Sequence, residues 1–278
     1  MTKEKDETKH KKKRKLKWQV KLFLLILFII IYAFFIGPKG IFIKDYNIKT
    51  SKIGNLSSGI KILQISDIYY GSTINKSDIK KIVKKINENN VDVVIFTGDL
   101  ISKNYDITNE DKTFLKKWLN KIDTELGKYY TTGEEDFEDT NEILGMAGFT
   151  NLNNNPQSIY DESNTPIIIM DKSVNKEYLE SGEAAPYFKI LAIHNPDDID
   201  DFNDANIDMA IAGHTLNGEI NIPKLRELFI SSKYKKGYQK VGNTKLYINA
   251  GCGTKGIKVR LFNHPTLNLY RINKTSTK

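Results

Sequence analysis

The sequence predicts an α/β fold in which two sheets pack together and helices cover the outside. In the first half of the chain, apolar β-branched segments alternate with segments whose apolar residues recur at helical spacing. In the second half, short apolar segments follow one another with fewer helical patterns between them, so sheet predominates there. The chain has 278 residues, of which 40% are hydrophobic, enough for the core of one or two domains.

The expected elements of the folded part alternate between strand and helix. Apolar, β-branched segments predict strands at residues 60–66, 91–97, 128–132, 166–170, 188–193, 209–212 and 245–249. Apolar residues spaced three or four apart predict two helices, 77–89 and 110–126. In the first helix, Ile79, Ile82 and Ile86 share one face, which predicts that this face is buried against a sheet.

The amino-terminal part predicts a membrane anchor. Residues 1–18 contain nine Lys or Arg and three acids, a net charge of 9 − 3 = +6. An uncharged apolar segment, 22–36, follows. A cleaved signal peptide is the alternative, but no small-residue cleavage site follows, so we favour an uncleaved anchor. Because basic residues stay inside, we expect a single-pass protein of the cell membrane, with a cytoplasmic amino terminus and an extracytoplasmic domain.

The chain is therefore expected to have four parts. These are a basic cytoplasmic tail (1–18), a transmembrane anchor (19–37), a linker with the first strand region (38–58) and a folded domain (59–278). Membrane lipid is the expected partner of the anchor and the tail. The whole chain carries +8, so the remainder carries only 8 − 6 = +2, and we expect no nucleic acid partner. The single cysteine excludes a disulfide framework and a cysteine-based zinc cluster.

Polar side chains follow five of the expected strands, at the carboxyl ends where open α/β sheets place their sites. These five strand tips are residues 66–69 (SDIY), 98–99 (GD), 133–136 (GEED), 194–197 (HNPD) and 212–215 (AGHT). Each tip alone is most simply a turn or a helix cap. Five successive tips that deliver carboxylates or imidazoles together indicate a site for a divalent cation.

The same motifs resemble the calcineurin-like metallophosphoesterases, in particular their membrane-associated phosphodiesterase branch, over about residues 45–272. The family pattern is D-x-H, G-D, G-N-H-[DE], a lone His and G-H-x-H. The corresponding segments here are DIY at 67–69, GD at 98–99, GEED at 133–136, HNPD at 194–197 and GHTL at 213–216. The resemblance implies a four-layer α/β/β/α sandwich and metal-dependent hydrolysis of a phosphoester. The substrate would be a phosphorylated small molecule or a lipid headgroup, or another ester linked to the envelope.

The resemblance implies two metal sites, and this sequence alters both. The first would use Asp67 and Asp99, but its two imidazoles are replaced by Tyr69 and Leu216. A leucine cannot bind a metal, and a neutral phenol is a poor ligand.

The second implied site would use Asp99, Glu134, His194 and His214, with Glu134 in place of the family's asparagine. We therefore expect one Zn, Mn or Fe ion rather than two, or no ion at all. Glu135 replaces the family's catalytic histidine, and it can serve as a general acid only where burial keeps it protonated.

Two functions are compatible with these substitutions. The first is a membrane-anchored phosphoesterase with a reduced metal site. The second is an inactive relative, a pseudoenzyme, that binds a phosphorylated headgroup or a partner at the membrane surface. A cytoplasmic nuclease is a third hypothesis, which the expected orientation and the near-neutral body disfavour. Lys255, Lys258 and Arg260 either contact phosphate or lie on a solvated strand edge, and we favour the solvated edge.

Overall fold

The computed structural model describes residues 17–275 except 55–58, 161–163, 223–224 and 229. Most of the predicted basic tail, residues 1–16, lies outside the described residues. The elements, in chain order, are α1 (Trp18–Ile31), η1 (Tyr32–Ile36), β1 (Phe42–Thr50), β2 (Ile60–Ile65), α2 (Lys76–Asn87), β3 (Val93–Thr97), α3 (Asn109–Leu119), β4 (Lys128–Thr131), α4 (Glu138–Met146), β5 (Phe149–Asn151), β6 (Gln157–Ile159), β7 (Ile167–Met170), α5 (Lys176–Glu180), β8 (Phe188–Ala192), η2 (Pro196–Phe202), β9 (Met209–Ala212), η3 (Arg226–Leu228), β10 (Tyr238–Val241), β11 (Thr244–Ile248) and β12 (Thr266–Lys274).

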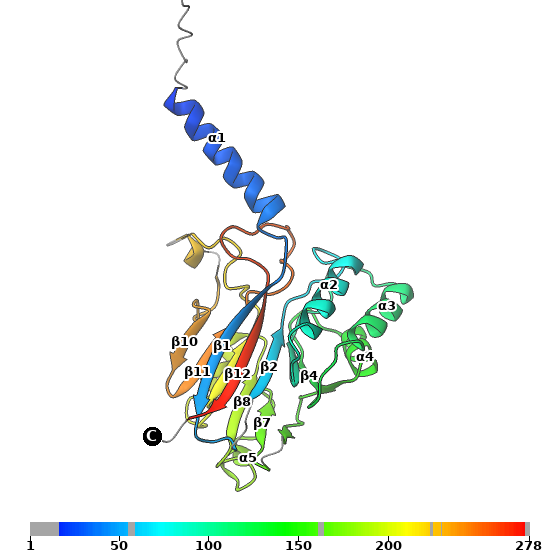
Figure 1. Ribbon diagram of the computed structural model, residues 1–278, viewed down its shortest axis with the longest axis vertical. Helices are drawn as coiled ribbons and strands as arrows, with labels where there is room; N and C mark the ends of the chain where they lie inside the picture. Colours follow the sequence, from blue (N-terminus) through cyan, green and yellow to red (C-terminus); the bar gives the residue numbers. More distant parts are fainter. Residues whose placement is uncertain (1–16, 55–58, 161–163, 223–224, 229, 276–278) are drawn as a thin grey trace, which may run out of the picture.

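Two mixed sheets form the centre of the domain (Figure 1). Within the described residues, the first sheet has the order β1-β12-β2-β3-β4-β5 and the second has the order β10-β11-β9-β8-β7-β6. Strands β2 to β5 are mutually parallel, as are β7, β8, β9 and β11. Parallel neighbours need crossover connections, and α2, α3 and α4 supply them in the first sheet.

Apolar side chains alternate between the two faces of each sheet and build three cores. Ile62 and Val93 of the first sheet pack against Ile169 and Ile190 of the second, which forms the central core. The other face of the first sheet packs on α2, α3 and α4, and that of the second sheet packs on α5 and η2. The arrangement is the expected four-layer α/β/β/α sandwich.

Local sequence explains where the predicted helices begin and end. The Asn75 side chain accepts hydrogen bonds from the backbone of Ser77 and Asp78, and therefore caps α2. The apolar face of α2 is buried, as the periodicity predicts. The second helix was predicted to reach residue 126, but α3 ends at Leu119. Ile122, which extended the apolar pattern, is buried from the turn that follows α3.

The region predicted as a linker with the first strand, 38–58, contains β1. This strand pairs in parallel with β12 along its whole length, from Phe42 opposite Thr266 to Thr50 opposite Lys274. β12 itself was not predicted. Each strand supplies the backbone partners of the other, so both depend on a contact between the two ends of the chain.

The carboxyl ends of the central strands lie on the side of the domain where the anchor enters (Figure 1). β1 starts shortly after η1 and runs away from α1; β12 is parallel to β1 and antiparallel to β2. Strands β2, β3 and β4 therefore end toward α1. Within the described residues, one segment, Trp18–Ile36, is long and apolar enough to cross a membrane. It projects from the domain with nearly all of its side chains exposed, as a candidate membrane span.

Candidate metal centre

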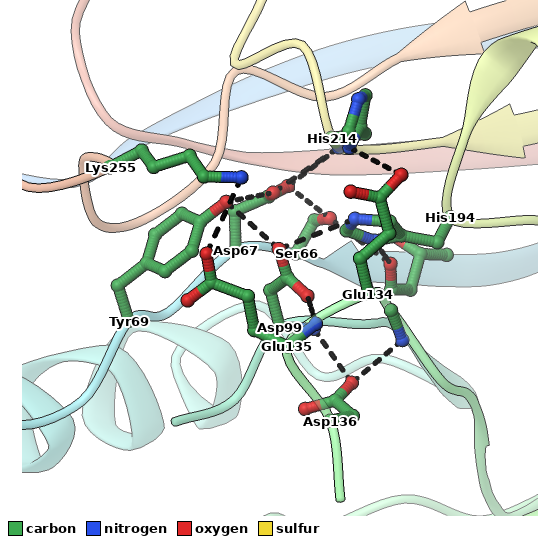
Figure 2. Close-up of polar contacts among 12 residues, drawn as sticks. Ser66, Asp67, Tyr69, Asp99, Glu134, Glu135, Asp136, His194, His214 and Lys255 are labelled. Carbon is green, nitrogen blue, oxygen red and sulfur yellow. Dashed lines mark hydrogen bonds and ion pairs between the residues drawn. The ribbon is translucent and has the colours of Figure 1, made fainter. Parts of the chain in front are cut away.

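Two carboxylates and one imidazole meet where strands of both sheets end (Figure 2). Asp67 follows β2, Asp99 follows β3 and His194 follows β8. One ligand atom from each lies within 4.8 Å of the others, and all three side chains are buried. Burying two neighbouring acids is costly unless a cation compensates them. The group therefore has the composition and the geometry of a site for a divalent ion.

The hydrogen bond of His194 selects the tautomer that a metal ion requires. Its Nδ1 lies 2.8 Å from the carbonyl oxygen of Thr97. A carbonyl only accepts, so Nδ1 carries the proton and, in the neutral ring, Nε2 keeps its lone pair. Nε2 is buried, has no hydrogen-bond partner among the described residues and lies 3.3 Å from Oδ2 of Asp99. A buried nitrogen without a partner beside two carboxylates fits a bound divalent cation.

The charges of the three groups are strongly linked. Burial raises the pKa of Asp67 to about 6. Burial alone would lower the pKa of His194, but Asp99 and Asp67 raise it to about 9. Burial alone would also raise the pKa of Asp99, yet His194 holds it below its ordinary value. Without a metal, a proton on His194 therefore compensates part of the negative charge of Asp67 and Asp99. A bound divalent ion would compensate that charge instead.

Tyr69 lies between the two carboxylates. Its hydroxyl donates to Oδ2 of Asp99 at 2.9 Å and lies 3.3 Å from Oδ1 of Asp67. Burial and the two acids raise the pKa of Tyr69 above its ordinary value, so the phenol stays neutral and acts as a donor. A hydrogen-bond donor thus satisfies the acids at the position where the resemblance implied a metal-binding imidazole.

Backbone strain is concentrated in the strand tips of the site. Left-handed φ angles occur at Asp67 (51°), Asp99 (62°) and His214 (63°). The same conformation is found at Tyr69, Leu216 and Asn217. Such conformations cost on the order of 1–3 kcal/mol each and are retained mainly where function requires a particular side-chain direction. The strain directs side chains of both sheets toward one centre.

Two glycines allow the tips to approach closely. A Cβ atom at Gly133 would lie 2.2 Å from Oδ1 of Asp99, and one at Gly213 would lie 1.9 Å from Oγ of Ser66. Ser66 in turn donates to Oδ2 of Asp67 at 2.5 Å. The site therefore requires glycine at both positions because the neighbouring tips leave no room for a side chain.

Asp136 ties the loops after β3 and β4 together, a role not predicted from the sequence. Its Oδ2 accepts hydrogen bonds from the backbone N–H groups of Asp99 at 2.7 Å and Gly133 at 2.8 Å. Its Oδ1 accepts one from the N–H of Leu100 at 2.9 Å. This role could have been predicted from the position of Asp136 at the end of the GEED segment, since an acid beside tight turns often accepts hydrogen bonds from backbone N–H groups.

Glu134 and His214 form a pair at the rim of the centre. Nδ1 of His214 lies 3.7 Å from Oε1 of Glu134, whose side chain is 56% exposed. The backbone N–H of His214 faces both carboxylate oxygens of Asp67, each at 3.2 Å. Burial lowers the pKa of His214. Of the five predicted ligands, Asp67, Asp99 and His194 form the tight group, while His214 and Glu134 lie beside it.

Glu135 and Lys255 meet on the other side of the site (Figure 2). Oε2 of Glu135 accepts a hydrogen bond from the N–H of Lys103 at 2.8 Å, and Oε1 lies 3.4 Å from Nζ of Lys255. Lys255 also lines a cavity of about 440 Å³ together with Glu134, His214 and the buried Leu216. An ammonium group therefore faces the space beside the metal centre.

The solvated strand edge expected at residues 255–260 is wrong for Arg260. This side chain is fully buried, and its guanidinium donates to the carbonyl oxygens of Gly251 and Gly253. Burial lowers its pKa to about 10. Arg260 holds the loop after β11 in place, and the site depends on that loop for Lys255.

Comparisons with known proteins identify the family of this chain. A family model described as calcineurin-like phosphoesterase matches residues 60–218. The uncharacterized metallophosphoesterase YkuE of Bacillus subtilis is 27% identical over 259 residues, which cover 88% of this chain and 90% of YkuE. A Danio rerio transmembrane protein with a metallophosphoesterase domain is 25% identical, over 78% of this chain and 54% of that protein.

Among solved structures, sulfate thiohydrolase SoxB of Thermus thermophilus superposes with a TM-score of 0.49 and 11% identity, over 79% of this chain and 57% of SoxB. The family match spans more than half of the chain and includes all five polar strand tips. The chain therefore belongs to the calcineurin-like phosphoesterase family.

Proposed function

We propose that this chain is a membrane-anchored, extracytoplasmic phosphoesterase that works with a single divalent ion, Zn, Mn or Fe. Asp67, Asp99 and His194 would hold the ion, with His214 and Glu134 beside it. The observation that carries the proposal is the gathering of Asp67, Asp99 and His194, whose buried ligand atoms lie within 4.8 Å of one another. Such an ion supplies Lewis acidity toward a phosphoryl oxygen and toward the attacking water.

The residues around the cavity support a phosphoester substrate. Lys255 presents a positive charge to the cavity, and its ion pair with Glu135 fixes the direction of its side chain. His214, whose pKa is lowered by burial, also lines the cavity. Two acids, Glu134 and Glu219, also line this cavity, so an anionic phosphate would need a metal ion at the candidate centre in addition to Lys255.

A single ion is favoured over the pair that the family pattern implies. The hydroxyl of Tyr69 occupies the side of Asp67 and Asp99 where another ion would need ligands. Leu216 adds only apolar surface there. The chemistry of the remaining donors suits one Zn, Mn or Fe ion.

The position of the site supports a substrate at the membrane surface. The polar strand tips lie at the end of the domain from which α1 emerges (Figure 1). A phosphorylated lipid headgroup, or another phosphoester linked to the envelope, would reach this end directly.

The same substitutions favour a second candidate, an inactive module that binds a phosphorylated headgroup or a partner at the membrane. Tyr69 already satisfies the two acids by hydrogen bonding, so the centre does not depend on an ion for that purpose. Saturable binding of a phosphodiester without turnover would identify this function.

The test uses the full chain purified in detergent. Metal content is measured after loading with Zn²⁺ or Mn²⁺, and hydrolysis of an aryl phosphodiester is followed in parallel. Asp99→Asn should abolish both. Asp111→Asn, which alters a buried carboxylate on α3 away from the site, is the matched control and should retain both. A parent protein without metal, and without hydrolysis above Asp99→Asn, would end the proposal.

A further inference from the structure

A second cavity lies where the anchor meets the folded domain. Its volume is about 650 Å³, and none of the residues at the candidate metal centre lines it. One wall comes from the end of the anchor and the residues after it, Phe34 to Ile41. The other walls come from one side of α2, from Asn75 to Lys85, and from the loops around Cys252, Lys258 and Pro265. The cavity therefore opens at the point where the candidate membrane span leaves the bilayer.

The cavity carries an excess of positive charge. Four lysines and one acid line it, which leaves a formal charge of 4 − 1 = +3. The acid, Asp78, is shared: its carboxylate lies 3.1 Å from Nζ of Lys81 and 3.8 Å from Nζ of Lys258. In the part of the chain that the structure describes, Lys39 and Lys85 form no ion pair. The charges thus attract an anion from outside the chain.

The lysines come from different elements but converge on one space. Lys85 lies one helical turn after Lys81, so the two side chains share a face of α2. Lys258 comes from a loop near the end of the chain. Its Nζ donates a hydrogen bond to the carbonyl oxygen of Thr73 at 2.7 Å, which fixes its position. Lys39 stands on the chain segment that leaves the anchor. Several ammonium groups that converge on one space can bind a phosphate group together, which separate lysines on the surface cannot do.

The wall nearest the anchor is apolar and continues the surface of the candidate span. Phe34 and Phe35 are 47% and 64% exposed, and they lie in η1 at the end of that span. Ile41 and Ile74 extend the apolar wall into the cavity. The anchor side of the cavity thus offers apolar surface together with the ammonium group of Lys39, and the other walls present the ammonium groups of Lys81, Lys85 and Lys258. A phospholipid has the same division between acyl chains and phosphate.

We propose that this cavity binds an anionic phospholipid of the membrane that α1 enters. The ammonium groups of Lys39, Lys81 and Lys85 would surround the lipid phosphate, and Phe34 and Phe35 would contact the first part of its acyl chains. A zwitterionic lipid would bring its own cation next to the lysines and bind less well. The bound lipid would also hold the domain upright on the bilayer, since one wall belongs to the anchor and another to α2.

The test measures lipid binding to the full chain in nonionic detergent by native mass spectrometry. The probe is dioctanoyl phosphatidylglycerol, and we expect saturable binding of one molecule. The triple variant Lys39→Gln, Lys81→Gln, Lys85→Gln should weaken binding about tenfold or more. The charge-matched control changes three exposed lysines outside the cavity, Lys49, Lys84 and Lys117, to Gln and should bind as the parent does.

Two further variants separate binding from folding. Replacing Lys39, Lys81 and Lys85 with Arg preserves the charge and should preserve binding. Lys85→Gln alone breaks no ion pair of the cavity and should weaken binding severalfold without lowering the unfolding temperature. If the glutamine triple variant fails to fold, these two variants decide the outcome.

Three results would overturn the proposal. Equal weakening in the cavity triple and the control triple would show that overall charge alone attracts the lipid. Equal binding of dioctanoyl phosphatidylcholine would show that the lysines do not distinguish an anionic headgroup from a zwitterionic one. Equal binding of glycerol phosphate would show that the acyl chains, and hence the membrane, play no part. The proposal shares the membrane anchor with the proposed function, but none of these measurements depends on a metal or on hydrolysis, so failure of the catalytic proposal would leave them unaffected.

Discussion

Replacing Tyr69 with phenylalanine probes the candidate metal centre with the smallest change. The substitution removes only a hydroxyl, which donates to Asp99 at 2.9 Å and lies 3.3 Å from Asp67. Both acids are fully buried, so water does not replace the lost donor. A hydrogen bond to a charged group contributes about 1.5–3 kcal/mol, and we expect Tyr69→Phe to lower the free energy of unfolding of the metal-free protein by that amount.

A divalent ion should reverse this loss. Once an ion neutralises Asp67 and Asp99, these carboxylates no longer need the phenol, so the cost of Tyr69→Phe should fall toward zero at saturating Mn²⁺. The assay is urea unfolding of the full chain in detergent, with chelator and with metal. The fluorescence of Trp118, which is half-buried on α3, reports the unfolding of the domain.

Tyr70→Phe is the matched control for this experiment. It also removes a tyrosine hydroxyl that donates to a buried carboxylate, Asp111 at 2.7 Å, but outside the metal centre. Its cost should be similar and should not change with metal. Our reasoning is refuted if Tyr69→Phe costs as much with metal as without, or if metal rescues Tyr70→Phe equally well.

Three further predictions follow from the same contacts. His194→Ala removes Nε2, the ring nitrogen that faces Asp99, and should weaken metal binding about a hundredfold or more, measured by calorimetric titration; unchanged affinity would place the ion elsewhere. Gly213→Ala would put a Cβ atom 1.9 Å from Oγ of Ser66 and should lower the unfolding temperature sharply, whereas Gly182→Ala, with no atom within 4 Å, should not. Burial alone would raise the pKa of Asp111, but three neighbouring hydroxyl groups hold it below its ordinary value. The stability contributed by this carboxylate is therefore present above about pH 4 and lost below it, so Asp111→Asn should be less stable than the parent near neutral pH and approach it in acid. A stability deficit that is constant with pH in urea titrations would contradict this assignment.

The parts of the fold that follow from local pattern were predictable. The apolar face of α2 was predicted from its periodicity, and the helix spans Lys76–Asn87 where 77–89 was expected; its Asn75 cap was not predicted. The meeting of Asp67 and Asp99 was also predictable, because parallel strands of one sheet bring their carboxyl ends to one edge. These inferences need only periodicity and strand direction.

Features that depend on long-range contacts were not predictable. β1 and β12 are partly polar strands from opposite ends of the chain; β1 pairs only with β12 among the described strands, and β12 lies between β1 and β2. The burial of Arg260 similarly requires carbonyl oxygens that the loop after β11 turns inward. Local pattern carries no information about such partners.

The directions of the side chains within the strand tips also could not be predicted from the sequence. Glu134 and Glu135 are neighbours in the sequence, yet one faces His214 at the rim and the other is buried against Lys255. Tyr69 reaches both acids because its backbone adopts a left-handed φ of 50°. Such conformations are rare for these residue types, so the sequence alone predicts the composition of the site better than its geometry.

The claim that one ion binds between Asp99 and His194 is tested most directly by anomalous diffraction from crystals of the full chain grown with Zn²⁺. We predict a single anomalous peak, about 2.0–2.1 Å from Nε2 of His194 and bonded to Asp99. Two peaks, or no peak in a crystal where Nε2 of His194 contacts only protein, would contradict the single-ion centre.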